Sequence, residues 1–278
     1  MEKSSLVDYF KEKALALGFD DSRLAALPDG SAVLLLFCAY GLEQGKTEHG
    51  RIPLSNYYPA AQKGYLLAKK MEKAAQEHGF SARTYKKHGL KQIALSAGGQ
   101  VGKNTLYRHP RLGTYVSIQA LPLPIELSAA APAEENSCKD CTACADACPT
   151  GAIGKSGFHK EKCLRFHTNK AEIPEEYGSL IYQLMGCERC QSACPKNPQR
   201  YEEAHSYDII EVLKGLHTPS LKKLIGTNYG TRTRIFNQTL FYAANTGYRA
   251  ALPQITSLID DELCGAAARY AYKKLTEG

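Results

Sequence analysis

Two short cysteine arrays constrain this chain more than any other feature of its sequence. They contain seven of its ten cysteines, in the patterns Cys138-x2-Cys141-x2-Cys144-x3-Cys148-Pro149 and Cys187-x2-Cys190-x3-Cys194-Pro195. Three thiolates on one tight loop can bind three irons of a four-iron, four-sulfur cube, and the fourth iron then needs a ligand from a distant segment. The Cys-Pro step directs the last thiolate of each array toward a neighbouring cube. The arrays therefore predict two [4Fe–4S] clusters, with the spacing of a bacterial ferredoxin.

Two cubes need eight thiolates, and the arrays supply seven. Leu184 occupies the position where the second array would have its first Cys, so the eighth ligand must come from elsewhere. Cys163 lies between the arrays, whereas Cys38 and Cys264 lie in distant apolar stretches and are expected to be inert core thiols. We therefore predict Cys163 as the eighth ligand. The predicted sets are Cys138, Cys141, Cys144 and Cys194 for one cluster and Cys148, Cys163, Cys187 and Cys190 for the other.

Zinc binding and disulfide bonding are the alternatives for so many cysteines. Zinc sites usually pair Cys-x2-Cys units across a longer gap and close with four ligands. The N-terminus lacks the basic and then apolar pattern of a secretory signal, which argues against a disulfide scaffold. None of the eight histidines forms an HxH or HxxxH pair. Iron–sulfur binding is therefore the favoured interpretation.

The distribution of charge and hydropathy indicates a cytoplasmic protein without a membrane segment. The longest apolar run, Ala32–Tyr40, is about half the length of a membrane span. The formal net charge is +7, and residues 61–115 carry eleven Lys or Arg against two Glu. Such a stretch can meet a polyanion or a phosphate-bearing cofactor, although a solvated helix face is the alternative.

The pattern of elements predicts an α+β multidomain protein. Helices are expected over Leu6–Leu17 and Tyr58–His78, and strands over Ala32–Cys38, Ser81–Tyr85 and Gly113–Leu121, with a helix and a glycine-rich loop before the last strand. A proline-containing linker, Ser128–Ser137, follows. The expected domains are an α/β domain (1–127), a ferredoxin-like two-cluster domain (138–200) and a domain with helical periods only (205–278).

The glycine-rich segment Ala97–Thr105 is a candidate ligand loop. It fails the Walker pattern, because Ala97 and Asn104 stand where Gly and Ser or Thr are required, and ATP binding is rejected. A flat or phosphate-bearing group could still approach a backbone with so few side chains. The alternative is a tight loop needed only for packing. The Tyr57–Tyr58 pair is either aromatic core, which the sequence favours, or the wall of a cofactor site.

The chain resembles the epoxyqueuosine reductase family, whose cluster domain is shared with corrinoid-dependent reductive dehalogenases. The matching segments are Cys138–Ile153, Cys163, Gly186–Pro195, Ala97–Thr105 and Gly113–Leu121. The resemblance implies an oxidoreductase in which two [4Fe–4S] clusters pass electrons to a cobalamin on the N-terminal domain, followed by a HEAT-like helical tail. It also implies a protein reductant, such as a ferredoxin or flavodoxin, and a tRNA substrate. The candidate cofactor-binding residues are Gly98, Gly99, Gly102, Lys103, Asn104 and Tyr57.

One segment departs from the family pattern. The family carries an Asp, thought to donate a proton, before the glycine-rich loop, and the corresponding stretch Ser81–Leu90 has no acidic residue. Tyr85 or a bound water are possible replacements, and the catalytic residues are left unassigned. The alternatives to epoxyqueuosine reduction are a corrinoid-dependent reductase of another substrate and a two-cluster electron-transfer protein.

Overall fold

The computed structural model describes residues 3–43, 47–83, 85, 89–128, 138–203 and 205–277. Contacts divide the chain into two compact units, each assembled from segments that are distant in sequence. The first unit comprises Met1–Tyr40, Ala60–Cys141 and Cys194–Gln199. The second comprises Gly41–Pro59, Thr142–Ala193 and Arg200–Gly278. The predicted linker lies, from residue 129 on, outside the described residues.

The first unit is built on a three-stranded antiparallel sheet of order β1-β2-β7. Its strands are β1 (Asp21–Ala26), β2 (Ser31–Ala39) and β7 (Val116–Glu126). Two short strands that precede β7 in the sequence, β5 (Gln100–Val101) and β6 (Tyr107–Arg108), pair with each other. In the register, Asp21 of β1 faces Phe37, and Leu34 of β2 faces Leu121 of β7. The central position of β2 explains its continuous apolar sequence.

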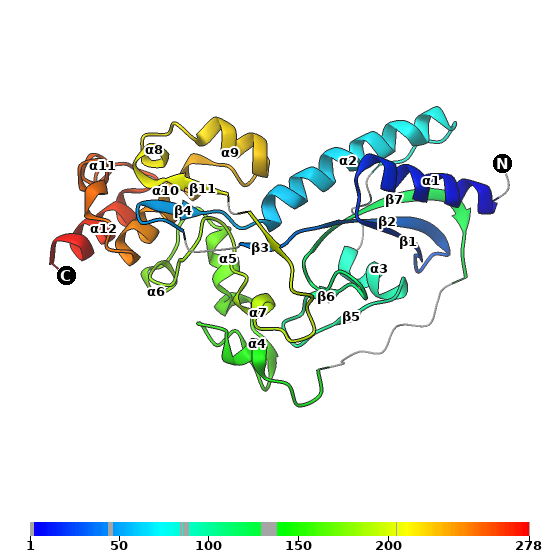
Figure 1. Cartoon of the computed structure of the whole chain (residues 1–278), viewed down its shortest axis with the longest axis horizontal. Coiled ribbons are helices and arrows are strands. Elements are labelled where there is room, and N and C mark those ends of the chain that lie inside the picture. Colours follow the sequence, from blue (N-terminus) through cyan, green and yellow to red (C-terminus); the bar gives the residue numbers. More distant parts are fainter. Residues whose placement is uncertain are drawn as a thin grey trace. The chain divides into compact units, whose positions relative to one another are not determined.

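Helices cover both faces of this sheet, so the unit has three layers (Figure 1). On one face, alternate β2 side chains such as Leu34 and Leu36 pack against α1 (Lys3–Leu17) and α2 (Tyr57–Glu77). On the other face, β2 packs against α3 (Leu90–Ser96). The helices α1 and α2 end before glycines with positive φ, Gly18 at +104° and Gly79 at +83°, which is the usual conformation after a helix C-terminus. The predicted helices and the central strand are confirmed.

The predicted strand over Ser81–Tyr85 is wrong for the described residues of that segment. Residues 81–83 and Tyr85 belong to no strand. The N–H of Tyr85 donates to the carbonyl of Ala120 in β7, at 2.8 Å, but one such bond does not make a ladder. The predicted strand over Gly113–Leu121 starts later, at Val116, because His109 and Gly113 form a tight bridge with Gly113 at φ +66°.

The second unit consists mainly of helices joined by short strand pairs. It contains β3 (Leu42–Glu43), β4 (Arg51–Pro53), α4 (Ala143–Asp146), β8 (Ile153–Gly154), β9 (Gly157–Phe158), the 3-10 turn η1 (Lys160–Lys162), α5 (Leu164–Thr168), α6 (Glu175–Gly178), α7 (Arg189–Ser192), β10 (Tyr201–Glu202), β11 (Ser206–Asp208), α8 (Ile209–Leu213), α9 (Thr218–Ile225), α10 (Arg232–Asn245), η2 (Arg249–Ala251), α11 (Leu252–Ser257) and α12 (Gly265–Glu277). The region from residue 205 is therefore not purely helical, since β11 pairs with β4. No helix in the described part of the chain is long and apolar enough to cross a membrane.

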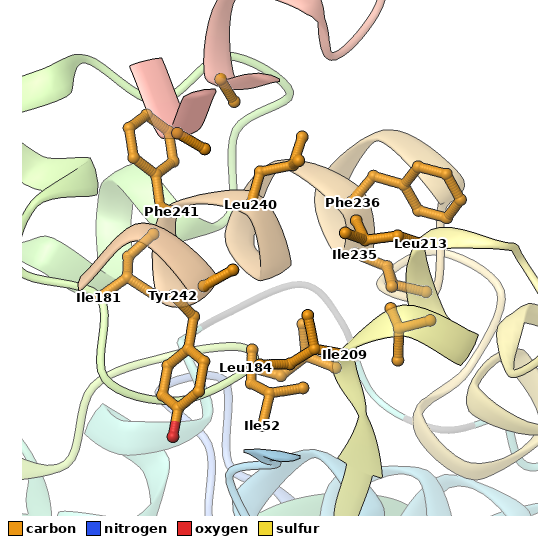
Figure 2. Close-up of a cluster of buried hydrophobic side chains, with 14 of the residues drawn as sticks. Ile52, Ile181, Leu184, Ile209, Leu213, Ile235, Phe236, Leu240, Phe241 and Tyr242 are labelled. Atoms are coloured by element: carbon orange, nitrogen blue, oxygen red, sulfur yellow. The ribbon is translucent and has the colours of Figure 1, made fainter. Parts of the chain in front are cut away.

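The helix α10 forms the centre of the core of the second unit. Every residue from Ile235 to Ala244 is buried. Figure 2 shows Leu240, Phe241 and other α10 side chains among apolar residues that come from the cluster region, from β4 and from α8. The helices after the second cysteine array therefore share one hydrophobic core with the segments that carry the cysteines.

Buried amide side chains on α10 also bind the backbone before the second array. Gln238, which is fully buried, accepts the N–H of Met185 at 2.7 Å and donates to the carbonyl of Thr168 at 3.0 Å. Asn245 donates to the carbonyls of Gly178 and Ile181, at 2.9 and 3.0 Å. These bonds fix the segment that leads to Cys187, because a buried backbone group without a partner costs free energy.

Replacing Gln238 with the similarly shaped Met tests this anchor. Gln238→Met keeps the volume but leaves a buried N–H and a buried carbonyl without partners, so we expect the free energy of unfolding to fall by about 2–4 kcal/mol. Anaerobic urea denaturation followed by circular dichroism measures it. The control is Thr239→Val on the same buried helix, which removes only a bond to Ile235 of that helix. Equal unfolding midpoints for Gln238→Met and the wild type would contradict the proposed anchoring.

A buried histidine stabilises the turn before β7. Nδ1 of His109 accepts the backbone N–H groups of Arg111 and Leu112, at 3.2 and 3.1 Å, and Nε2 lies 2.8 Å from a carboxylate oxygen of Asp21. Burial, followed by the charge of Arg23, lowers the pKa of His109 to about 4, although Asp21 opposes the shift. The imidazole is therefore neutral in the folded protein at pH 7.

This histidine predicts a loss of stability in mild acid. The unfolded chain binds the proton near pH 6.5 and the folded chain near pH 4. The contribution is therefore complete above pH 6.5 and is lost progressively as the pH falls toward 4. Between pH 7 and 5 we expect the wild type to lose about 2 kcal/mol more than His109→Gln. Urea titrations of both proteins at the two pH values measure the difference, and parallel losses would exclude this role of His109.

Candidate metal centre

Five cysteines of the two arrays and the segment between them belong to the second unit. The 3-10 turn η1 places Cys163 at the N-terminus of α5, and α7 carries Cys190. Burial, followed by the charges of four other cysteines, raises the pKa of the Cys190 thiol to about 12; these four are Cys187, Cys163, Cys144 and Cys148. The sulfurs are therefore close enough to repel one another as thiolates, and bound iron would supply the positive charge that holds them deprotonated.

Hydrogen bonds prepare Cys148 to act as a thiolate. Burial raises the pKa of this thiol, but hydrogen bonds from the Thr150 side chain and from the backbone N–H groups of Thr150, Ala152 and Ile153 outweigh it, and the net pKa lies below its ordinary value. The sulfur of Cys148 lies 3.5 Å from the Thr150 hydroxyl. Donors directed at a ligand sulfur are the usual surroundings of an iron–sulfur cluster.

Cys187 has a similar but more buried environment. Burial raises its pKa, whereas the backbone of Arg189 and the hydroxyl of Tyr182 oppose this through hydrogen bonds to its sulfur. The same hydroxyl accepts the backbone N–H of Glu188, at 2.8 Å, and the Glu188 carboxylate accepts a bond of 2.7 Å from Ser55. This network orients the loop between Cys187 and Cys190. Leu184, which stands where a first Cys of the second array would be, is fully buried in the core.

The first unit holds Cys138, Cys141 and Cys194. The N–H of Cys141 donates to the carbonyl of Cys138 at 2.7 Å, which closes a tight turn. This turn lies beside the glycine-rich loop: a Cβ at Gly102 would be 3.6 Å from the Cys138 sulfur, and the Lys103 ammonium donates to the Cys141 carbonyl at 3.0 Å. The first cluster loop and the candidate cofactor loop are therefore in direct contact.

Contacts with the protein's own side chains fix the conformation of the glycine-rich loop. Gly98 and Gly99 have φ of +86° and +119°, and the hydroxyl of Tyr107 donates to the Gly98 carbonyl at 2.7 Å. A Cβ at Gly99 would lie 2.5 Å from the Tyr107 ring. Asn104 is buried and accepts the N–H of Leu106, at 3.2 Å. Packing therefore accounts for Gly99 and Asn104, and it leaves the loop's backbone free of bulky side chains.

Tyr57 lies in the second unit, at the first position of α2. One face of its ring is covered by the guanidinium of Arg165, 4.1 Å from the ring centroid. Its neighbour Tyr58 is a core residue, 1% exposed, whose hydroxyl donates to Asn169 at 3.1 Å. The structure thus separates the two tyrosines, since Tyr58 belongs to the core and Tyr57 is half-buried at its edge.

The two cysteines far from the arrays in sequence, Cys38 and Cys264, have the properties of inert thiols. Cys38 is completely buried in β2, and burial raises its pKa to about 11. Burial and a hydrogen bond to Asp261 raise the pKa of Cys264 to about 12. In the described ranges, no three His, Cys, Asp or Glu side chains are grouped so as to hold a single metal ion. In a cube each thiolate binds a different iron, so its ligands lie further apart than those of one ion.

This donor set and its surroundings define a double-cluster iron–sulfur protein. Residues 137–197 match the model of a family described as a 4Fe-4S double cluster binding domain, which confirms the predicted cofactor class. The sequence is 37% identical to an epoxyqueuosine reductase of Staphylococcus aureus over 137 residues, which cover 47% of this chain and 35% of that protein. The chain thus matches about a third of the length of that relative.

Other relatives match almost the whole chain. An epoxyqueuosine reductase of Lactococcus garvieae is 26% identical over 314 residues, covering 98% of this chain and 88% of the relative. A crystal structure of epoxyqueuosine reductase with an epoxyqueuosine-modified tRNA-Tyr stem loop superposes with a TM-score of 0.75 and 19% identity, covering 98% of this chain and 90% of that one. The chain is therefore similar in sequence to epoxyqueuosine reductases and shares the fold of the solved one, in agreement with the resemblance.

Substitution of single cysteines tests the ligand assignment. Cys163→Ala removes one of eight thiolates, so we expect the iron content to fall below about eight per chain and the EPR signal of one reduced cube to be lost or altered. Cys38→Ala and Cys264→Ala are the matched controls and should retain all of the iron. A full iron content and two unaltered signals in Cys163→Ala would contradict its role as the eighth ligand.

Proposed function

We propose that this protein is an iron–sulfur and cobalamin-dependent oxidoreductase that reduces epoxyqueuosine to queuosine in tRNA. One observation supports it most directly: the glycine-rich loop, the candidate cobalamin site, is bonded through Lys103 to the loop that carries Cys138 and Cys141. An electron that reaches this cluster is then next to the candidate cofactor loop. In the proposal the helices α8–α12 form a HEAT-like tail, and the protein works in the cytoplasm.

In this proposal each cluster has four ligands from this chain. Cys138, Cys141, Cys144 and Cys194 bind one, and Cys148, Cys163, Cys187 and Cys190 bind the other. A ferredoxin or flavodoxin supplies electrons one at a time. Gly98, Gly99, Gly102 and Asn104 offer a backbone that a flat cofactor can approach, and Tyr57 is a further candidate contact. Bound cobalamin would supply the low-potential cobalt chemistry that removes the epoxide oxygen, while the protein positions the substrate and excludes water.

The basic stretch gives the proposed tRNA a place to bind. Lys63, Lys69, Lys70 and Lys73 of α2 are exposed, and Lys or Arg side chains on one helix attract phosphates over a long range. The proton that the reduction requires would not come from an acidic residue of Ser81–Leu90. Tyr85 is a candidate, because burial, followed by the charge of Asp29, raises the pKa of its phenol and keeps it protonated.

Cobalamin binding by the anaerobically reconstituted protein is the first test. We expect a changed visible spectrum and an altered Co(II) EPR signal, and then conversion of epoxyqueuosine in a modified tRNA stem loop, with an unmodified stem loop as control. Binding without conversion would favour a corrinoid-dependent reductase of another substrate. Absence of binding, with about eight irons per chain, would replace the proposal by a two-cluster electron-transfer protein.

A further inference from the structure

Lys103 is the charged residue of the glycine-rich loop, and its ammonium group is already engaged by the protein. It donates to the backbone carbonyl of Cys141 at 3.0 Å, across 38 residues of sequence. The side chain is partly buried. A lysine that served a cofactor phosphate or amide would present this group to the ligand, whereas here it is directed at a cysteine of the cluster loop.

Hydrogen bonds close the turn that carries Lys103, and the bond to the Cys141 carbonyl holds its ammonium group. The N–H of Gly102 donates to the Leu106 carbonyl at 3.2 Å, and the N–H of Thr105 donates to the Gly102 carbonyl at 2.8 Å. Asn104 closes the same turn through its bond to Leu106. The backbone of the turn also lies close to Cys138, because a Cβ at Gly102 would be 3.6 Å from the Cys138 sulfur.

A fixed positive charge at this place acts on the cluster electrostatically. A [4Fe–4S]2+ unit with four thiolates carries about −2, and one-electron reduction brings it to about −3. A nearby ammonium stabilises the more negative, reduced state more strongly, because the Coulomb energy grows with the charge. Partial burial limits the screening that would cancel this effect at an exposed lysine.

We propose that Lys103 sets the reduction potential of the cluster bound by Cys138 and Cys141, and is not a cofactor ligand. The positive charge raises that potential, so that this cluster accepts an electron from the protein reductant or from the second cluster more readily. The inference rests on the two-cluster assignment of the proposed function, but it requires neither cobalamin nor tRNA. It also explains why a lysine stands in a loop that is otherwise small and neutral.

The test is an EPR-monitored redox titration of the holoprotein with dithionite and mediators. In Lys103→Met we expect one of the two clusters to be harder to reduce, with the ratio of reduced to oxidised cluster at a given potential lowered on the order of tenfold. The other cluster should keep its potential. Lys103→Arg retains the charge and should stay close to the wild type.

Two further variants separate charge from other effects. Lys103→Gln retains a side-chain N–H donor but is neutral, so it should behave like Lys103→Met. A wild-type potential in Lys103→Gln would overturn the electrostatic role. Lys91→Met is the matched control, because the Lys91 ammonium donates to Thr105 of the same turn, also at 3.0 Å, but is exposed and binds no cluster cysteine. It should leave both potentials unchanged.

The outcomes also distinguish this inference from the function on which it rests. Two cube signals with wild-type potentials in Lys103→Met would overturn the role of Lys103 and leave the clusters in place. If Lys103→Met weakened cobalamin binding without any shift of potential, Lys103 would be a cofactor ligand after all. A wild-type protein without two cube signals would instead refute the two-cluster assignment itself.

Discussion

Crowding of buried thiols is the constraint on which the second unit depends. Cys190 lies among four other cysteines whose charges, together with burial, raise its pKa to about 12, so the sulfurs do not stay together as thiolates through their own interactions. Bound iron would supply the missing positive charge, and the backbone that carries the thiols must be held in place for it. That task falls to α10, where Gln238 and Asn245 bind the backbone before Cys187 from within a hydrophobic core. The C-terminal helix α10 thus holds the segment that leads to Cys187 in place.

In the first unit, a turn and a charged side chain, and not a buried helix, hold the backbone that carries the cysteines. Gly102 is small because the Asn104 side chain and the Cys138 sulfur lie next to it, and Lys103 reaches the Cys141 carbonyl. Gly99 is small because the Tyr107 ring lies under it. Close packing against the protein therefore requires these glycines. The same absence of side chains leaves the backbone accessible to a flat group. Packing and cofactor binding are compatible explanations of one loop.

The sequence predicted best those features that local chemistry dictates. Cysteine spacing follows from the geometry of a cube. The helices α1 and α2 are followed by glycines with positive φ, Gly18 and Gly79, and β2 is apolar because both of its faces are covered. It failed where a pairing partner decides, as in Ser81–Tyr85, where one bond from Tyr85 to β7 does not make a strand. The anchoring role of Gln238 could not be predicted for the same reason, because its partners Met185 and Thr168 are 53 and 70 residues away in the sequence.

Lys103 lies in the loop that the sequence singled out, and its contacts support a role other than the predicted cofactor binding. From the sequence, a lysine after glycines suggests a ligand for something that approaches the loop. The structure directs its ammonium to the chain's own Cys141 carbonyl, where the group is occupied and its charge is held next to a cluster ligand. A cluster of net negative charge gains from this position with every electron it accepts, whereas a neutral cofactor face would gain little. The physical argument therefore favours the cluster as the partner of this charge, and the glycines around it as the surface left for the cofactor.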